Sequence, residues 1–239
     1  MDTNWPKRQV IVPFQKPVEV IFGPHENRGI CFSKTLSNDN TDNVAIIDLE
    51  SEELQSYTIP NAAISSATIS NLGDEKIVFA SSSGKLFWFD LKLGKITREH
   101  SPVHQEITSI AANSDHGTLA LGLENGEIHL YSEDTMELQR TFVHDESVSL
   151  LSFGGNGQLI VAGGNENHLN IWEIASGLTI GNKLTHQEKI VDLDVCDATQ
   201  SIITATAGGQ IKVWPIPTKD DRDIETIREE AKKLLLIAK

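Results

Sequence analysis

The sequence predicts an all-β fold, a propeller of about five blades in which each blade is an antiparallel sheet of four short strands. Two series of side chains recur with a period of about 42 residues, and the two series run in register. Within each period, short alternating segments are separated by turns rich in glycine and asparagine. A repeat of about 40 to 45 residues that contains four strands is typical of a propeller blade.

The first series is the bulky residue near the end of an apolar alternation. Its members each stand one period apart, and they are Ile47, Phe89, Tyr131, Trp172 and Trp214. The second series is a histidine that opens similar phrases such as "HQEITSI" and "HQEKIVDL". Its members keep nearly the same period, and they are His104, His144 and His186, with Asn61 and Gln15 at the equivalent earlier places.

Four strands fit within each period. In the fourth repeat we expect them at 148–153, 158–163, 169–174 and 178–184. The intervening "GGNG" and "GNENH" supply the positive φ angles that tight hairpin turns need. The third strands are apolar at consecutive positions, which indicates a sheet packed on both faces. A blade between two neighbouring blades requires that arrangement.

Complete sets of four strands are predicted over 17–60, 62–103, 107–143 and 147–185, whereas 189–217 supplies three. The separate segment "RQVIVPF" (8–14) would provide the missing strand of the last blade and close a ring. An open part of a larger propeller is the alternative. Trp5 lies one period before Ile47, in the register of the first series. Loose placement of Trp5 would favour the closed ring, and packing in its own strand would favour the larger propeller.

Residues 218–239 are predicted as a linker and an amphipathic helix, outside the propeller domain of 8–217. Apolar residues recur there at helical spacing, at Ile224, Ile227, Ala231, Leu234, Leu235 and Ala238. The helix would either dock on the propeller's rim or serve as a handle for a partner.

Composition narrows the class of partner. The 34 acidic and 20 basic residues give a net charge of −14, which disfavours nucleic acid as a partner. No run approaches about 18 apolar residues, and no charged leader precedes an apolar stretch, so we expect neither a membrane span nor a signal peptide. Cys31 and Cys196 are expected to be buried, reduced thiols, which favours an intracellular, cytoplasmic protein.

The repeated phrases resemble the WD-repeat family of β-propellers, and the resemblance covers roughly residues 8–217. In that family, a histidine lies in the loop entering each blade and a tryptophan lies near the end of the third strand, often followed by aspartate. The resemblance assigns structural roles to His104, His144, His186, Trp172 and Trp214, with Phe89 and Tyr131 as aromatic substitutes. The following aspartate is present as Asp48 and Asp90.

The family often adds an aspartate before the third strand, joined to the histidine by a hydrogen-bonded network. The corresponding turns here offer Ser83, Asn125, Glu166 and Gly208. We therefore expect no repeat to carry the full network, and we expect the blades to depend on apolar packing. The family commonly has seven blades, which favours the larger propeller, whereas the strand count favours five.

Phe87 is a large aromatic residue at a third-strand position where the other repeats have small or polar residues. These residues are Ala45, His129, Asn170 and Lys212. Two interpretations are open. Phe87 either fills a local gap in the packing or forms an exposed anchor for a partner.

No motif predicts a catalytic residue, a metal site or a cofactor. The stretch "FGGNGQ" (153–158) lacks the lysine and serine of a phosphate loop. His100 and His104 do not lie on a helix face that would align two ligands, and Asp39 and Asp42 lack the spacing of a calcium loop. The first strands, which line a propeller's channel, begin with apolar residues, at Val18, Ile64, Ile107, Val148 and Ile190.

The sequence therefore predicts a non-catalytic scaffold that binds proteins or peptides on a propeller face. A sensor or regulatory module of a larger signalling protein is the alternative. A glycosidase is a further hypothesis, but it would need paired carboxylates in the channel, where the predicted lining is apolar. The expected partner is a protein or peptide, not a nucleic acid or a membrane. The binding face and the oligomeric state are left open.

Overall fold

The computed structural model describes residues 18–22, 28–33, 43–60, 62–70, 72, 75–113 and 115–216. These residues form five antiparallel sheets, which we call blades 1 to 5 in chain order, and the predicted all-β propeller is confirmed. The segment 8–14, Trp5 and the predicted C-terminal helix lie outside the described residues. Closure by the N-terminal strand therefore stays a prediction.

Each blade follows the same plan, in which every strand pairs with the next one along the chain. The strands are β1 (Val18–Phe22), β2 (Arg28–Ser33), β3 (Val44–Asp48) and β4 (Leu54–Tyr57) in blade 1; β5 (Ile64–Ile69), β6 (Lys76–Ser81), β7 (Leu86–Asp90) and β8 (Lys95–His100) in blade 2; β9 (Ile107–Asn113), β10 (Thr118–Leu123), β11 (Glu127–Ser132) and β12 (Leu138–Val143) in blade 3; β13 (Leu150–Gly154), β14 (Leu159–Gly163), β15 (His168–Glu173) and β16 (Leu184–Thr185) in blade 4; and β17 (Ile190–Cys196), β18 (Ser201–Thr206) and β19 (Ile211–Pro215) in blade 5.

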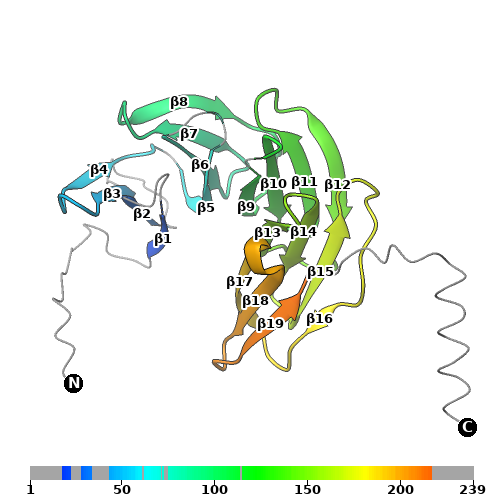
Figure 1. Ribbon diagram of the computed structural model, residues 1–239. Helices are drawn as coiled ribbons and strands as arrows, with labels where there is room; N and C mark the ends of the chain where they lie inside the picture. Colours follow the sequence, from blue (N-terminus) through cyan, green and yellow to red (C-terminus); the bar gives the residue numbers. More distant parts are fainter. Residues whose placement is uncertain are drawn as a thin grey trace, which may run out of the picture.

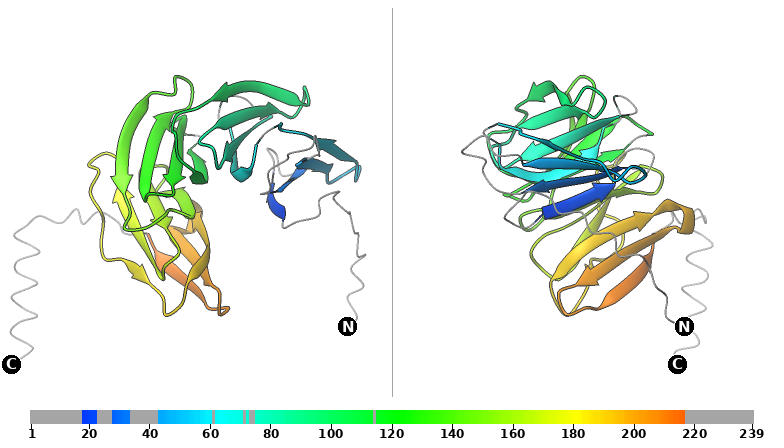
Figure 2. Two further views of the ribbon diagram at one scale, coloured as in Figure 1. Left: turned by 180° about the vertical axis from the view of Figure 1, so that it is seen from behind. Right: turned by 90° about the vertical axis from the view of Figure 1, so that its left-hand side faces the viewer.

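The blades succeed one another along an arc, with blades 1 and 5 at its two ends (Figure 1). The view from behind shows the same arc and the same separation of its ends (Figure 2). In blades 2 to 5, the loop that enters the blade and the turn between its second and third strands lie at one end of the sheet. We call this end the entry face. It gathers short segments from these blades, and such loops carry binding sites in many folds.

Glycine is required at the tight turn between the second and third strands. Gly84 and Gly126 have φ angles of 81° and 90°. An added Cβ would overlap the carbonyl oxygen of Val103 at the first position and would lie 2.6 Å from that of His144 at the second. Each glycine therefore lets the turn approach the loop that enters the next blade.

The two aspartates that follow the first marker series have a local role. Asp48 Oδ1 accepts hydrogen bonds from the backbone N–H groups of Glu50 and Ser51, at 3.0 and 2.8 Å. Asp90 Oδ1 accepts the equivalent bonds from residues 92 and 93. These contacts hold the turn between the third and fourth strands, and the backbone bonds lower the pKa of Asp48.

The hydrophobic core lies between blades. Each blade has a forward face, toward the next blade, and a backward face, toward the previous one. Alternate residues of the second and third strands form the forward face, and in blades 1 to 4 they pack on the bulky marker residue of the next blade. At the junction between blades 2 and 3, for example, Leu86 and Trp88 share one cluster with Leu119, Leu121 and Tyr131.

Phe87 belongs to this core. It is 4% exposed and packs with Phe32 and Phe79 in the cluster between blades 1 and 2. The interpretation of Phe87 as an exposed anchor for a partner is therefore wrong, because the forward face of blade 1 covers the side chain. Its role is packing, the other interpretation that the sequence left open.

Arginines on the fourth strands of blades 2 and 3 tie each of these two blades to the next. Arg98 donates to the carbonyl oxygens of Glu133 and Asp134, at 3.0 and 2.9 Å, and its guanidinium lies 4.6 Å from the centre of the Trp88 ring. The indole N–H of Trp88 donates to the buried Glu133 carboxylate at 2.9 Å. Arg140, one period of the repeat after Arg98, donates to the carbonyl oxygen of Ala175 at 3.1 Å.

We expect Arg98→Ala to destabilise the fold by about 1–3 kcal/mol, because two charge-assisted hydrogen bonds and an aromatic contact are lost together. Arg140→Ala is the matched comparison, since it removes the one bond to Ala175 and should cost less. Urea unfolding followed by circular dichroism measures both. Equal effects would show that the contact with Trp88 contributes nothing.

Candidate functional site

A polar pocket of about 310 Å³ opens on the entry face, and we call it the hydroxyl pocket. Its lining comes from blades 2, 3 and 4 and is Ala63, Ile64, Ser65, Ser82, Glu106, Thr108, Ser147, Ser149 and Asn165. Hydroxyl and amide groups can donate or accept hydrogen bonds, so the lining is able to bind peptide backbone or polar side chains.

Two of these hydroxyls also join neighbouring blades. Ser65 Oγ donates to the carbonyl oxygen of Ile107, and Thr108 Oγ1 donates to that of Val148 at 2.5 Å. The two bonds span 42 and 40 residues, so they repeat with the blades. They satisfy carbonyl groups at the start of the next first strand and fix the pocket's wall.

Of the expected apolar lining of the channel, Ile64 does line the pocket, but at Ile107 and Val148 the lining is displaced by one residue. Ile107, Val148 and Ile190 are buried between blades, at 0 to 1% exposure. Their neighbours Thr108 and Ser149 line the pocket instead. Successive side chains of a strand point to opposite faces, so an error of one residue exchanges the buried and the accessible set. The side chain of Val18 lies outside the described residues.

Carboxylates surround the hydroxyl pocket. Glu106 is part of its lining, and the N–H of Glu124 donates to the carbonyl oxygen of Glu106 at 3.2 Å. Glu146 and Glu166 lie on the next two loops of the same face. A hydrogen bond with Glu166, followed by burial, raises the pKa of Glu146. Lys189 also reaches this lining and donates from Nζ to Asn165 Oδ1 at 2.9 Å, so the acidic groups named here outnumber this cation.

Blade 5 carries a polar network that the sequence analysis did not expect. The indole N–H of Trp214 donates to Thr204 Oγ1 at 3.0 Å, and this oxygen lies 2.6 Å from His186 Nε2. His186 Nδ1 lies 3.1 Å from Gln210 Oε1. We expected no repeat to carry the family's full network with its aspartate. Blade 5 has no such aspartate in this chain of contacts, but Trp214, Thr204, His186 and Gln210 are connected. Gln210 is the fourth member of this network. It lies two residues beyond Gly208, the residue that the sequence analysis placed in the aspartate's turn.

Blade 4 has the same spacing with one member missing. His144, Ala162, His168 and Trp172 stand one period of the repeat before His186, Thr204, Gln210 and Trp214. Ala162 lacks the hydroxyl of Thr204, and the buried Nε2 of His144 has no hydrogen-bond partner. His144 Nδ1 accepts from the N–H of Glu146 at 3.1 Å. The His144 ring stacks on His168 with centroids 5.4 Å apart.

Charged groups meet at the outer edge of this blade. His168 lies 3.1 Å from a carboxylate oxygen of Glu166 and 3.7 Å from one of Asp145. Lys183 pairs with Asp145 and lowers the pKa of that carboxyl group. Burial lowers the pKa of His144, so this histidine is held neutral near pH 7. Its environment fits a structural role.

His104, the remaining histidine of the series, differs from the other two in its exposure. His104 is exposed in the loop that follows β8, whereas His144 and His186 are buried. Tyr131 replaces tryptophan in this blade, and its hydroxyl group lies 3.3 Å from His129 Nδ1. Within the described residues, no group of three or more histidine, cysteine or acidic side chains is placed to hold a metal ion.

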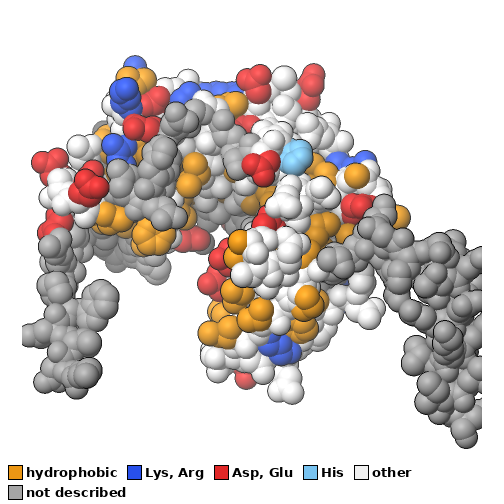
Figure 3. All heavy atoms as spheres, in the orientation of Figure 1, with side chains coloured by type: hydrophobic (Ala, Val, Ile, Leu, Met, Phe, Trp, Pro, Cys, Tyr) orange, Lys and Arg blue, Asp and Glu red, His pale blue; other side chains and the backbone are white. Residues whose placement is uncertain are grey.

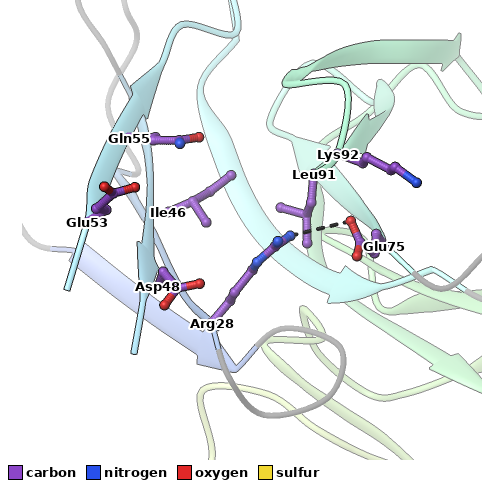
Figure 4. Close-up of a pocket in the computed structure, with 8 residues that line it drawn as sticks. All are labelled: Arg28, Ile46, Asp48, Glu53, Gln55, Glu75, Leu91 and Lys92. Carbon is purple, nitrogen blue, oxygen red and sulfur yellow. Dashed lines mark hydrogen bonds and ion pairs between the residues drawn. The ribbon is translucent and has the colours of Figure 1, made fainter. Parts of the chain in front are cut away.

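A second pocket, of about 460 Å³, lies between blades 1 and 2 at the end opposite the entry face. Figure 4 shows Arg28 reaching toward Glu75 across this space, and the two side chains are 3.5 Å apart. Asp48 and Lys92 also line it, so charges of both signs face one another. Because this ion pair joins blade 1 to blade 2, we assign the pocket a structural role.

Several of these residues escaped the sequence analysis. Thr204 lies 18 residues after His186 and 10 before Trp214, and a search at those offsets would have found it. The spacing of Arg98 and Arg140, one period of the repeat, was equally visible. The hydroxyl pocket was not, because its residues are recognisable only once the facing direction of each first strand is known.

Comparison with known proteins supports this description. Residues 136–173 match the model of the WD40 family, described as "WD domain, G-beta repeat". The matched segment begins before β12, ends with β15 and includes His144 and Trp172. The chain is a β-propeller that contains a WD repeat. In the matched repeat, His144 lies in the loop before β13 and Trp172 lies on β15.

Two kinds of curated protein are similar to parts of this propeller. Pre-mRNA-processing factor 19 of Schizosaccharomyces pombe is 29% identical over 140 residues, which is 57% of this chain and 27% of the relative. Eukaryotic translation initiation factor 3 subunit I of Pyricularia oryzae is 33% identical over 76 residues, 31% of this chain and 22% of the relative. The chain thus spans only about a quarter of each relative's length.

A solved structure supports the fold alone. The crystal structure of the computationally designed protein Ika4 superimposes with a TM-score of 0.55 at 19% identity, covering 65% of this chain and 92% of Ika4. Among the described residues of the WD-repeat protein, no helix has the length and apolarity needed to cross a bilayer.

Supplying the missing hydroxyl of blade 4 should stabilise the protein. We expect Ala162→Ser to raise the free energy of unfolding by about 1 kcal/mol, because it offers a partner to His144 Nε2. Thr204→Ala, the converse change in blade 5, should lower it by about 1–3 kcal/mol, because it removes the partner of His186 Nε2 and of the Trp214 indole N–H. Urea denaturation gives both values. A destabilising Ala162→Ser would show that the site lacks room for the oxygen.

The pair formed by Glu146 and Glu166 should make stability depend on pH. Because the pKa of Glu146 is raised in the folded state, its ionisation costs stability as the pH rises above the ordinary value of 4.5. We expect Glu146→Gln to raise the melting temperature at pH 7 and to lose this advantage near pH 4. Glu124→Gln, with the same change of charge on the same face, is the control. A constant difference across the pH range would contradict the assignment.

Proposed function

We propose that this WD-repeat protein is a non-catalytic scaffold that binds a protein or peptide segment on its entry face. The observation that carries the proposal is the hydroxyl pocket, because three blades contribute to it and its walls are fixed by bonds between blades. A preformed polar pocket on a rigid support reduces the entropy lost on binding.

The chemistry of the pocket favours an extended peptide with basic side chains. The serine, threonine and asparagine groups of the lining can pair with peptide N–H and C=O groups. Glu106 within the pocket, and Glu124 and Glu166 near it, would attract lysine or arginine. The same negative charge opposes nucleic acid and anionic membranes, so neither is proposed as a partner.

The relatives are consistent with this role at a coarser level. One is a pre-mRNA-processing factor and another is a subunit of a translation initiation factor. We propose a corresponding part in a protein assembly inside the cell, with the cytoplasm as the compartment. Cys31 and Cys196 are both free thiols, which a reducing compartment would preserve, although only Cys31 is buried as expected and Cys196 is half-buried.

A selection from a random peptide library tests the proposal. We expect the wild-type chain to enrich peptides that contain lysine and arginine. Ser149→Arg places a large cation in the pocket and should weaken binding of a selected peptide at least about tenfold, which corresponds to about 1.4 kcal/mol. Glu106→Gln should weaken binding less and should reduce its salt dependence.

Leu178→Arg is the matched control, because Leu178 is exposed on a turn of blade 4 away from the pocket lining. It introduces the same cation and should leave the affinity unchanged. Failure to enrich any peptide, or equal binding by Ser149→Arg and the wild type, would refute the proposed site.

A further inference from the structure

The forward face of blade 5 is exposed where the other four blades bury theirs. Val213 is 65% exposed and Ile211 is 68% exposed. The residues at the position of Val213 in the other blades are 1 to 7% exposed, and they are Ile46, Trp88, Leu130 and Ile171. Those at the position of Ile211 are fully buried, and they are Val44, Leu86, Ile128 and Leu169.

Strand pairing extends this face over β18. Ile203 is the partner of Val213 in the register of β18 and β19, and it is exposed too. Figure 3 shows hydrophobic side chains gathered on the part of the surface that β17–β19 occupy. At each internal junction, an apolar sheet face of this kind is buried by the next blade.

The opposite end of the arc carries the other half. Ile21 packs into the cluster between blades 1 and 2, so its neighbours on β1 point to the backward face of blade 1. These neighbours are Val20 and Phe22, which are 57% and 65% exposed. Phe22 pairs with Gly29, which leaves the ring room to stand out from the sheet. At the internal junctions, too, a forward face packs on an aromatic side chain of the next blade's backward face, such as Phe89 or Tyr131.

We propose that two copies of this chain associate head to tail, with the forward face of blade 5 of one copy packed on the backward face of blade 1 of the other. Each of the four internal junctions joins a forward face to a backward face, and one of each is left over among the described blades. Within one copy these two faces stand apart at the ends of the arc (Figures 1 and 2).

The proposed contact continues the packing that the chain already uses. It joins unlike surfaces, so it is a head-to-tail contact between the two copies. Asp192 pairs with Ala205 and Asp194 with Ile203, so both exposed carboxylates stand on the first strand of this same face. Since each copy carries a charge of −14, association should strengthen as salt screens the repulsion.

The test is light scattering coupled to size-exclusion chromatography on the 239-residue chain. At a chain concentration of about 100 µM and moderate salt, we expect the wild type to have at least twice the 26.3 kDa mass of one chain. Val213→Glu and Phe22→Glu should each be monomeric. Val143→Glu is the matched control, because Val143 is 68% exposed on the outer strand β12, and it should behave as the wild type.

Mixing the two disabled variants separates association between copies from closure within one copy. Phe22→Glu keeps an intact forward face on blade 5, and Val213→Glu keeps an intact backward face on blade 1. Their equimolar mixture should restore a species of two chains and no larger one. Ile211→Glu replaces Val213→Glu if that variant fails to give the circular dichroism spectrum of the wild type.

A monomeric wild type would overturn the proposal, whether the ring closes within one chain or both faces stay uncovered. Association that survives Val213→Glu, or a mixture that stays monomeric, would also overturn it. Binding of peptides by the hydroxyl pocket is measured independently, so either proposal can fail alone.

Discussion

The packing of a forward sheet face on the backward face of the next blade is the interaction on which the rest of this structure depends. Each blade is a thin sheet that cannot bury its apolar side chains alone, so its stability comes from its neighbours. The bulky marker of one blade fills the space left by the smaller forward residues of the blade before it, as Trp172 does against Ala120 and Leu130. This need explains why third strands are apolar on both faces.

Polar contacts join neighbouring sheets, and some of them also form part of the candidate site. The hydroxyls of Ser65 and Thr108 bond to the next blade at the inner edge, and Arg98 does so at the outer edge. The inner bonds also form a wall of the hydroxyl pocket. A surface able to bind a peptide therefore arises where the propeller has to satisfy its own backbone groups.

Blades 4 and 5 show how the same repeat tolerates loss of a polar partner. Blade 5 has a connected chain from Trp214 through Thr204 to His186, whereas Ala162 interrupts it in blade 4. Trp172 stays buried against its apolar neighbours all the same. Apolar packing thus holds the blades even where the network is broken, as the sequence indicated, although the network is more complete than the sequence suggested.

The sequence by itself determined the repeat, the first three strands of each blade and the apolar third-strand positions, because these depend on local alternation and on a period of about 42 residues. Only the tertiary structure decided which alternate residues face the channel, that Phe87 is covered by blade 1, and that Ile211 and Val213 are left exposed. The physical reason is that burial of a sheet face is settled by the sheet opposite it, and a linear pattern does not show whether that neighbour is present.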